Sequence, residues 1–194
     1  MHRDVLELRG THDDSSALHT LGVLAHGLGE WTTAADLFES SLAISDALEP
    51  GWNPGRAGTV INMTGSLINA GQRERAEEIC AEAIEYLRTL PEGERPHYEL
   101  GLYLLGTCAF RRGAFELAEE SLREALELRL ASVGEEDAFT GEHLHLLGVS
   151  LAGLGRLEEA EGFLARAVDA KRAVYPAGHA RLVASEEELA KLRD

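Results

Sequence analysis

The apolar positions of this chain recur at the spacing of amphipathic helices, and the pattern as a whole repeats every 42 residues. Four glycines mark the period: Gly29, Gly71, Gly113 and Gly155. Each is followed five positions later by an alanine: Ala34, Ala76, Ala118 and Ala160. Because a fixed period of 20 to 50 residues is the signature of repeat architectures, the sequence predicts four copies of one structural unit.

Each copy predicts two antiparallel helices. In the third copy, YELGLYLLGTCAFRR (98–112) carries an apolar stripe at helical spacing. Gly113 then ends that helix as a residue that tolerates positive φ, and AFELAEESLREALELRLAS (114–132) supplies the second helix. A small residue seven positions before each periodic glycine lets the two helices approach closely: Gly22, Thr64, Gly106 and Gly148. One hairpin cannot bury both of its faces, so the hairpins are expected to stack into an all-α solenoid with a concave surface.

These residues resemble the tetratricopeptide repeat (TPR) family over about 12–194. The resemblance rests on LGVLAHGLGEWTTAADLFESSL (21–42), LGTCAFRRGAFELAEESLREAL (105–126) and LGVSLAGLGRLEEAEGFLARAV (147–168). It implies a right-handed superhelical solenoid of antiparallel hairpins. The period exceeds the family's usual 34 residues and is similar to the longer variant of kinesin light chains and many bacterial signalling proteins. The position of the family's helix-ending proline is occupied here by other residues, so the second helix can continue: Asp46, Arg88, Leu130 and Arg172.

The expected organisation is four repeats with partial units at both ends. VLELRG, within residues 1–11, looks like the last turns of a preceding second helix, which makes this segment an N-terminal remnant or partial helix. Residues 181–194 predict a C-terminal capping helix, because Glu186 stands where an apolar residue would pack. The repeats between them are expected at 12–54, 55–96, 97–138 and 139–180.

Composition narrows the function classes. The 194 residues include 34 acidic and 18 basic side chains, a net charge of −16 that repels nucleic acid and anionic membranes. Residues 12–54 alone hold seven acidic side chains and no Lys or Arg. The sequence has no membrane-spanning apolar stretch, no signal peptide and only two cysteines, so a cytoplasmic location is expected. The excess of Arg over Lys, with the Ala and Gly content, suggests a bacterial source.

The chemical motifs of enzymes are missing from the sequence. It contains no nucleophile elbow, Walker loop, dinucleotide fingerprint or His-Glu-x-x-His motif, so no catalytic residue and no cofactor is expected. His12, His19 and His26 recur every seven residues. Residues seven apart on one helix are separated by about 10 Å, so these imidazoles cannot chelate one ion and no metal site is expected.

The family resemblance places ligand contacts on the first helix of each repeat. The candidates for partner binding are His19, His26, Asn62, Asn69, Tyr103, Phe110, Arg111 and His145. An asparagine at the position of Asn62 commonly contacts ligand main chain in the family, and its amide both donates and accepts. For the others a structural role competes: Asn69 with helix capping, Tyr103 and Phe110 with packing between helices, and Arg111 with a solvated position. Trp52, in a Gly/Pro loop, either contacts a partner or folds back onto the helix ends.

The function expected from the sequence is a non-enzymatic scaffold that binds a protein or peptide in the concave groove. With one arginine among its groove positions, the chain departs from the basic groove of kinesin light chains, so a neutral, partly apolar ligand is expected. Two alternatives stay open: the sensor or regulatory arm of a larger bacterial signalling protein, and a small-molecule or catalytic groove that uses His and Tyr side chains. The sequence is compatible with a monomer and with a dimer.

Overall fold

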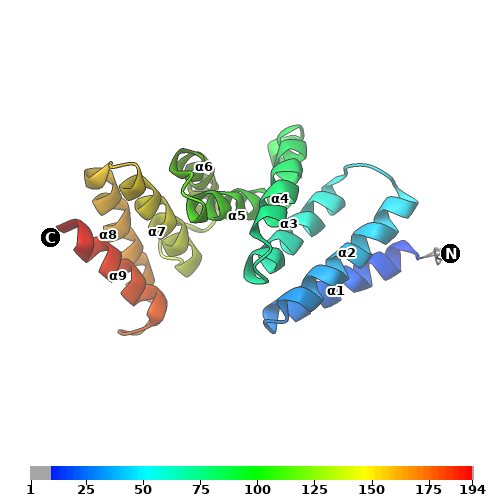
Figure 1. The fold of residues 1–194 in the computed structure, drawn as a ribbon, viewed down its shortest axis with the longest axis horizontal. Coiled ribbons are helices and arrows are strands. Elements are labelled where there is room, and N and C mark those ends of the chain that lie inside the picture. Colours follow the sequence, from blue (N-terminus) through cyan, green and yellow to red (C-terminus); the bar gives the residue numbers. More distant parts are fainter. Residues whose placement is uncertain (1–9, 194) are drawn as a thin grey trace. The chain divides into compact units, whose positions relative to one another are not determined.

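The chain folds entirely into helices and turns in the part that the structure describes. The structure is a computed structural model describing residues 10–193, and over that range it contains nine α-helices, one short 3-10 helix and no strand (Figure 1). The all-α fold of antiparallel hairpins is confirmed. Of the expected N-terminal remnant 1–11, residues 1–9 lie outside the described residues. Among the described residues, no helix is both long and apolar enough to cross a membrane.

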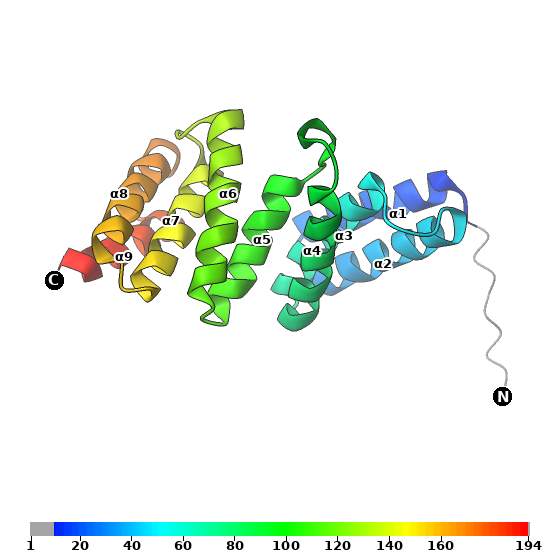
Figure 2. The same cartoon turned by 90° about the horizontal axis from the view of Figure 1, so that it is seen from above.

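The chain divides into two compact units, residues 1–97 and 98–194. The first contains α1 (His12–Gly27), α2 (Trp31–Leu48), α3 (Pro54–Asn69), α4 (Arg73–Arg88) and η1 (Glu92–Glu94). The second contains α5 (Tyr98–Arg111), α6 (Phe115–Val133), α7 (Ala138–Gly153), α8 (Leu157–Val174) and α9 (Ala180–Arg193). Within each unit, consecutive helices pack side by side (Figure 2). The repeat boundaries stay a prediction, and α3, α7 and α9 each begin one residue before an expected boundary.

The turn inside each hairpin has the same geometry in all four copies. Gly29, Gly71, Gly113 and Gly155 adopt φ of 81°, 84°, 79° and 75°, the left-handed region that favours glycine. In the first copy the Gly29 N–H donates to the carbonyl of His26 and the Glu30 N–H donates to that of Ala25. This is the Schellman pattern, which satisfies the last carbonyls of a helix. The prediction that Gly113 ends a helix with positive φ is confirmed.

The two helices of a hairpin meet at the small residue predicted for close approach. A Cβ on Gly106 would lie 2.6 Å from Cγ of Leu122, closer than real contacts allow. The same approach occurs at two other hairpins, Gly22 against Phe38 and Gly148 against Leu164. In the second hairpin the register pairs the larger Thr64 with the smaller Cys80, so the summed volume is roughly kept.

Two three-helix segments correspond residue for residue at an offset of three periods. Adding 126 to the bounds of α1 and α2 gives the bounds of α7 and α8, and adding it to the first residue of α3 gives that of α9. The loops between these helices also have equal lengths. Positions in α1–α3 can therefore be compared directly with positions in α7–α9.

Candidate functional site

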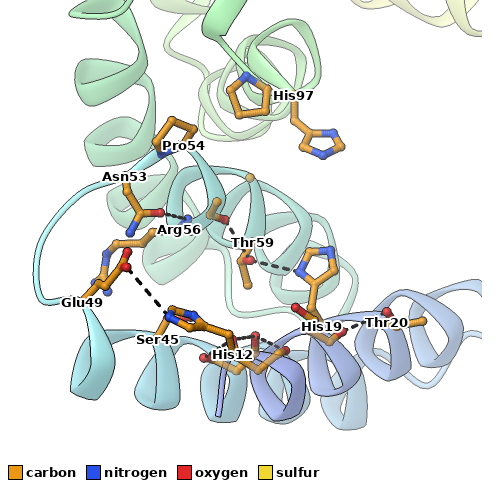
Figure 3. Close-up of a pocket in the computed structure, with 16 residues that line it drawn as sticks. His12, His19, Thr20, Ser45, Glu49, Asn53, Pro54, Arg56, Thr59 and His97 are labelled. Carbon is orange, nitrogen blue, oxygen red and sulfur yellow. Dashed lines mark hydrogen bonds and ion pairs between the residues drawn. The ribbon is translucent and has the colours of Figure 1, made fainter.

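A cavity of about 590 Å³ opens in the first unit where α1, the end of α2 and the start of α3 meet (Figure 3). Its lining combines polar groups with a somewhat larger area of apolar surface. Serine and threonine hydroxyls share it with the imidazoles of His12, His19 and His97 and the carboxylate of Glu49. A volume between 300 and 1,000 Å³ is usual for a ligand pocket. Of the eight candidates from the sequence, His19 alone contributes to this lining.

His19 links α1 to α3 at the wall of the cavity. Its Nδ1 lies 3.0 Å from Oγ1 of Thr59, whose hydroxyl also lies 3.0 Å from the carbonyl oxygen of Gly55. If Thr59 donates to that carbonyl, His19 donates from Nδ1 and its Nε2 accepts from Nδ2 of Asn62, 3.4 Å away. Burial, and then the charge of His97, lowers the pKa of His19. The neutral imidazole therefore persists at pH 7 and orients Asn62.

His26 makes a second contact between α1 and α3, seven residues after His19 on α1. Its Nδ1 lies 2.8 Å from Oγ of Ser66, and its ring meets the edge of Trp31 with centroids 5.2 Å apart. Burial lowers the pKa of His26. Asn69 is exposed at the last position of α3 and does not reach this contact.

The aromatic candidates of the second unit lie within its packing. The Tyr103 ring lies 4.5 Å from that of His143 and 4.9 Å from that of Phe139, measured between centroids. Burial, followed by the negative charge of Glu142, raises the pKa of Tyr103 to about 12. Phe110 packs against the core with its ring 6.0 Å from Phe115. In this unit the packing role competes directly with ligand contact.

Arg111 lies at the end of α5 and is exposed, as expected for a solvated arginine.

Trp52 folds back onto its own unit, which is one of the two alternatives that the sequence left open. Its ring stacks on Tyr86 at 5.7 Å and lies under the guanidinium of Arg56 at 5.1 Å.

His145 takes part in a buried polar cluster under α9. Its Nδ1 lies 3.0 Å from Oγ of Ser185, and Nζ of Lys171 donates to the same oxygen at 3.0 Å. Nζ also donates to Oε2 of Glu142 at 3.1 Å and to the carbonyl of Arg181 at 3.2 Å. Lys171 is 1% exposed, so its charge is compensated inside the protein.

The electrostatics of this cluster follow from burial. Burial, and then the positive charge of Lys171, lowers the pKa of His145 to about 4. Burial also lowers the pKa of Lys171, against the opposing effect of Glu142. His145 is therefore neutral at pH 7, and it is half-buried against α9, where it contacts Ser185.

The offset of 126 residues shows that the cavity beside His19 and the polar cluster around His145 occupy equivalent positions in the repeat. His19 corresponds to His145, and the partner Thr59 corresponds to Ser185, so an imidazole meets a hydroxyl 40 residues later in both. Ser45 corresponds to Lys171. The cavity of the first unit therefore lies where the second unit has a lysine side chain.

Sequence reasoning missed several of these residues. Ser45 and Lys171 become conspicuous only when polar residues, rather than apolar ones, are aligned at 42-residue steps. Glu49 sits in a loop outside the periodic pattern. His97 has φ of 56°, and a Cβ on Gly58 would lie 3.1 Å from its Cδ2. No pattern in the sequence predicts the close approach of His97 to Gly58.

Comparison with known proteins agrees with this architecture. The family model of the tetratricopeptide repeat matches residues 98–173. The fold is similar to a Podosopora anserina structure of kinesin light chain nearly identical TPR-like repeats, with 19% identity and a TM-score of 0.73, covering 94% of this chain and 86% of that one. It is also similar to BtubC (BKLC) from P. vanneervenii, with 19% identity and a TM-score of 0.73 over 91% of this chain and 70% of that one.

A third similar structure is the apo form of RapI, with 15% identity and a TM-score of 0.69 over 95% of this chain and 72% of that one. The sequence matches none of the curated proteins. Structures at these identities establish the fold, and the resemblance inferred from the repeat motifs is confirmed at that level.

Proposed function

We propose that this chain, in which residues 98–173 are tetratricopeptide repeats and the fold is TPR-like, is a non-enzymatic scaffold that binds a segment of a protein partner. The partner would contact the first-helix side of the repeats through shape and hydrogen bonds, without a covalent step. The cytoplasm of a bacterium is the proposed setting.

The observation that carries the proposal is the open cavity of the first unit, whose lining offers both polar groups and apolar surface. It draws on α1, α2 and α3 together, so it exists only because neighbouring repeats are packed. Beside it, Asn62 uses its N–H toward His19, which leaves its carbonyl oxygen as the group to accept a peptide N–H. A half-buried amide held by a second side chain is preorganised for main-chain recognition.

The histidines and tyrosine of the catalytic alternative do not converge on one point within either unit. His19 and His26 contact different partners on α3, Thr59 and Ser66. In the second unit His145 is covered by α9, where its contact is Ser185. The geometry supports binding better than catalysis, because a reactive centre needs a nucleophile, a base and a substrate position in mutual reach.

Selection from a displayed library of random peptides tests the proposal directly. Peptides that bind the wild type are measured against Asn62→Ala and Tyr103→Ala by titration calorimetry. We expect at least one variant to weaken binding about tenfold, equivalent to about 1.4 kcal/mol, with unchanged helicity by circular dichroism. Glu82→Ala, on an exposed position of α4, is the matched control. Equal affinity of all three variants would place the binding face elsewhere.

A further inference from the structure

The second unit shows what the cavity position accepts, because there it is occupied by the protein's own lysine. The Lys171 side chain passes over Gly141, whose added Cβ would lie 2.8 Å from Cγ of Lys171. The ammonium then meets a carboxylate from Glu142, the hydroxyl of Ser185 and the carbonyl of Arg181. These are the acceptors that a charged amine requires when it leaves water.

The first unit has a hydroxyl and a carbonyl at the equivalent positions but lacks the lysine. Thr59 supplies the hydroxyl that Ser185 supplies in the second unit, and the Gly55 carbonyl stands at the position of the Arg181 carbonyl. Ser45 replaces the lysine. The space that an alkylammonium chain fills in one unit is therefore part of a cavity in the other.

The charges around the cavity favour a cation over an anion. Residues 12–54 hold seven acidic side chains and no Lys or Arg, and one of the seven, Glu49, lines the cavity. Among the described residues that line the cavity, Arg56 carries the guanidinium, and it is paired with Asp46. The Glu49 carboxylate is exposed, and its ion-pair contact is Nε2 of His12 at 3.9 Å.

The start of α3 offers little to an anion. Pro54 has no N–H, the Arg56 N–H donates to the Asn53 side chain at 2.9 Å, and the Ala57 N–H donates to the Asn53 carbonyl at 3.0 Å. The donors that usually make a helix N-terminus an anion site are thus largely used.

We infer that the cavity between α1, α2 and α3 binds the ammonium group of a lysine side chain presented by a partner peptide. Glu49 supplies the countercharge, and the Thr59 hydroxyl and Gly55 carbonyl accept hydrogen bonds. The lysine stem lies along Pro54 and Pro96. The inference rests on the proposed peptide-binding function and names the residue class that the first unit recognises.

Pentapeptides with blocked termini test whether the site prefers a positively charged side chain to a neutral or a negatively charged one. Ala-Ala-Lys-Ala-Ala is titrated against the 194-residue chain and followed by the NMR signals of His19, and peptides with norleucine or glutamate in place of the lysine are titrated in the same way. We expect the lysine peptide to bind at least tenfold more tightly than either. It should also lower the pKa of His19, as Lys171 lowers that of His145. Equal binding of the norleucine peptide overturns the inference, and so does tighter binding of the glutamate peptide.

Two substitutions copy the second unit into the first. Ser45→Lys should fill the cavity from within and weaken the lysine peptide at least tenfold, whereas Ser40→Lys adds the same charge at an exposed position of α2 and should weaken it less than threefold. Ser16→Glu places a carboxylate where Glu142 stands in the second unit and should tighten binding severalfold. If Ser45→Lys does not fold, the Ser16→Glu result decides, and unchanged affinity there contradicts the inference.

Putrescine separates a peptide lysine from a free amine. We expect it to bind at least tenfold more weakly than the lysine peptide, and tighter binding would assign the site to a small amine instead. The library selection keeps the two proposals distinguishable. If selected peptides depend on Asn62 but tolerate replacement of every lysine, the scaffold function stands and the lysine site falls.

Discussion

The segments α1–α3 and α7–α9 are built on the same 126-residue register, yet one contains an open cavity and the other a buried charge cluster. In both, an imidazole on the first helix meets a hydroxyl on the next first helix. Two positions differ in charge, because Ser45 and Ser16 of the first segment correspond to Lys171 and Glu142 of the second. The ion pair at these positions makes a buried contact in the second segment, and without it the first segment has an open cavity.

The comparison also identifies the polar contacts that join α9 to α8. Lys171 and Arg172 on α8 contact α9, through the Ser185 hydroxyl and the Glu186 carboxylate. In the second unit these contacts join α8 to α9, whereas Ser45 and Thr59, at the positions of Lys171 and Ser185, line the cavity of the first unit.

The largest effect is expected from removing the buried lysine. Lys171→Met removes the buried ammonium from Glu142, whose side chain is 16% exposed and keeps the longer contact to the exposed Arg181 at 3.6 Å. Breaking a buried ion pair on one side typically costs about 3–5 kcal/mol. Urea unfolding followed by circular dichroism measures the loss, with Lys191→Met, an exposed lysine paired with Glu188, as the control. A loss below about 1 kcal/mol would show that the cluster is solvated and that the two segments differ less than their geometry indicates.

A smaller effect should appear on acidification, and it should be greater for His145 than for His19. The pKa of His145 is about 4 in the folded protein, against about 6.5 unfolded. A depressed histidine pKa means that its contribution is complete above the unfolded value and is lost as pH falls from 6.5 toward 4, because the unfolded chain then binds the proton first.

Thermal unfolding at pH 7 and pH 4 checks this prediction with His145→Gln and His19→Gln. Between the two pH values, the wild type should lose on the order of 2 kcal/mol more than His145→Gln, which cannot titrate. The difference from His19→Gln should be smaller, because His19 borders the open cavity. Identical pH dependence of the wild type and His145→Gln would mean that α9 does not bury the imidazole.

A third effect comes from rebuilding the ion pair in the first unit. Ser45→Lys combined with Ser16→Glu recreates the pair that Lys171 and Glu142 form. Both sites face the cavity, so the coupling free energy from a double-mutant cycle should be about 1 kcal/mol, between that of surface and buried pairs. Additive effects would show that the two positions are not in reach of each other in the first unit.

The helices and their hairpins were predictable from sequence because apolar periodicity and glycine spacing record backbone demands. Gly29 and its three counterparts need positive φ, and Gly106 needs contact with Leu122, so both leave a regular trace in the sequence. The turn glycine recurs in all four repeats and the close-approach glycine in three of them, and this recurrence made both constraints visible in the sequence.

The candidate site was less predictable because its chemistry depends on differences between repeats. His19, His26 and His145 were found as groove positions, but their hydroxyl partners lie 40 residues away, on the next first helix. The cavity depends on a serine that looks ordinary until it is compared with Lys171. Trp52 shows the same limit, because its stacking on Tyr86 depends on how the loop after α2 returns to α4.

The smallest effect concerns two ion pairs whose residues on the second helix, Asp46 and Arg172, occupy one register position and carry opposite charges. Asp46 on α2 pairs with Arg56 on α3, and Arg172 on α8 pairs with Glu186 on α9. Exposed pairs contribute about 0.2–1 kcal/mol. Arg56 is 24% exposed in its side chain and Arg172 is 58% exposed, so Asp46→Ala should destabilise more than Arg172→Ala.

Urea unfolding in 0.05 M and 0.5 M salt separates the two pairs, since the more exposed one is screened more strongly. We expect the cost of Arg172→Ala to vanish at high salt and part of the cost of Asp46→Ala to remain. The reverse order would mean that the α2–α3 junction is as solvated as the α8–α9 surface. Arg56 would then be available to an anion at the cavity, and the preference for a cationic ligand would lose one of its supports.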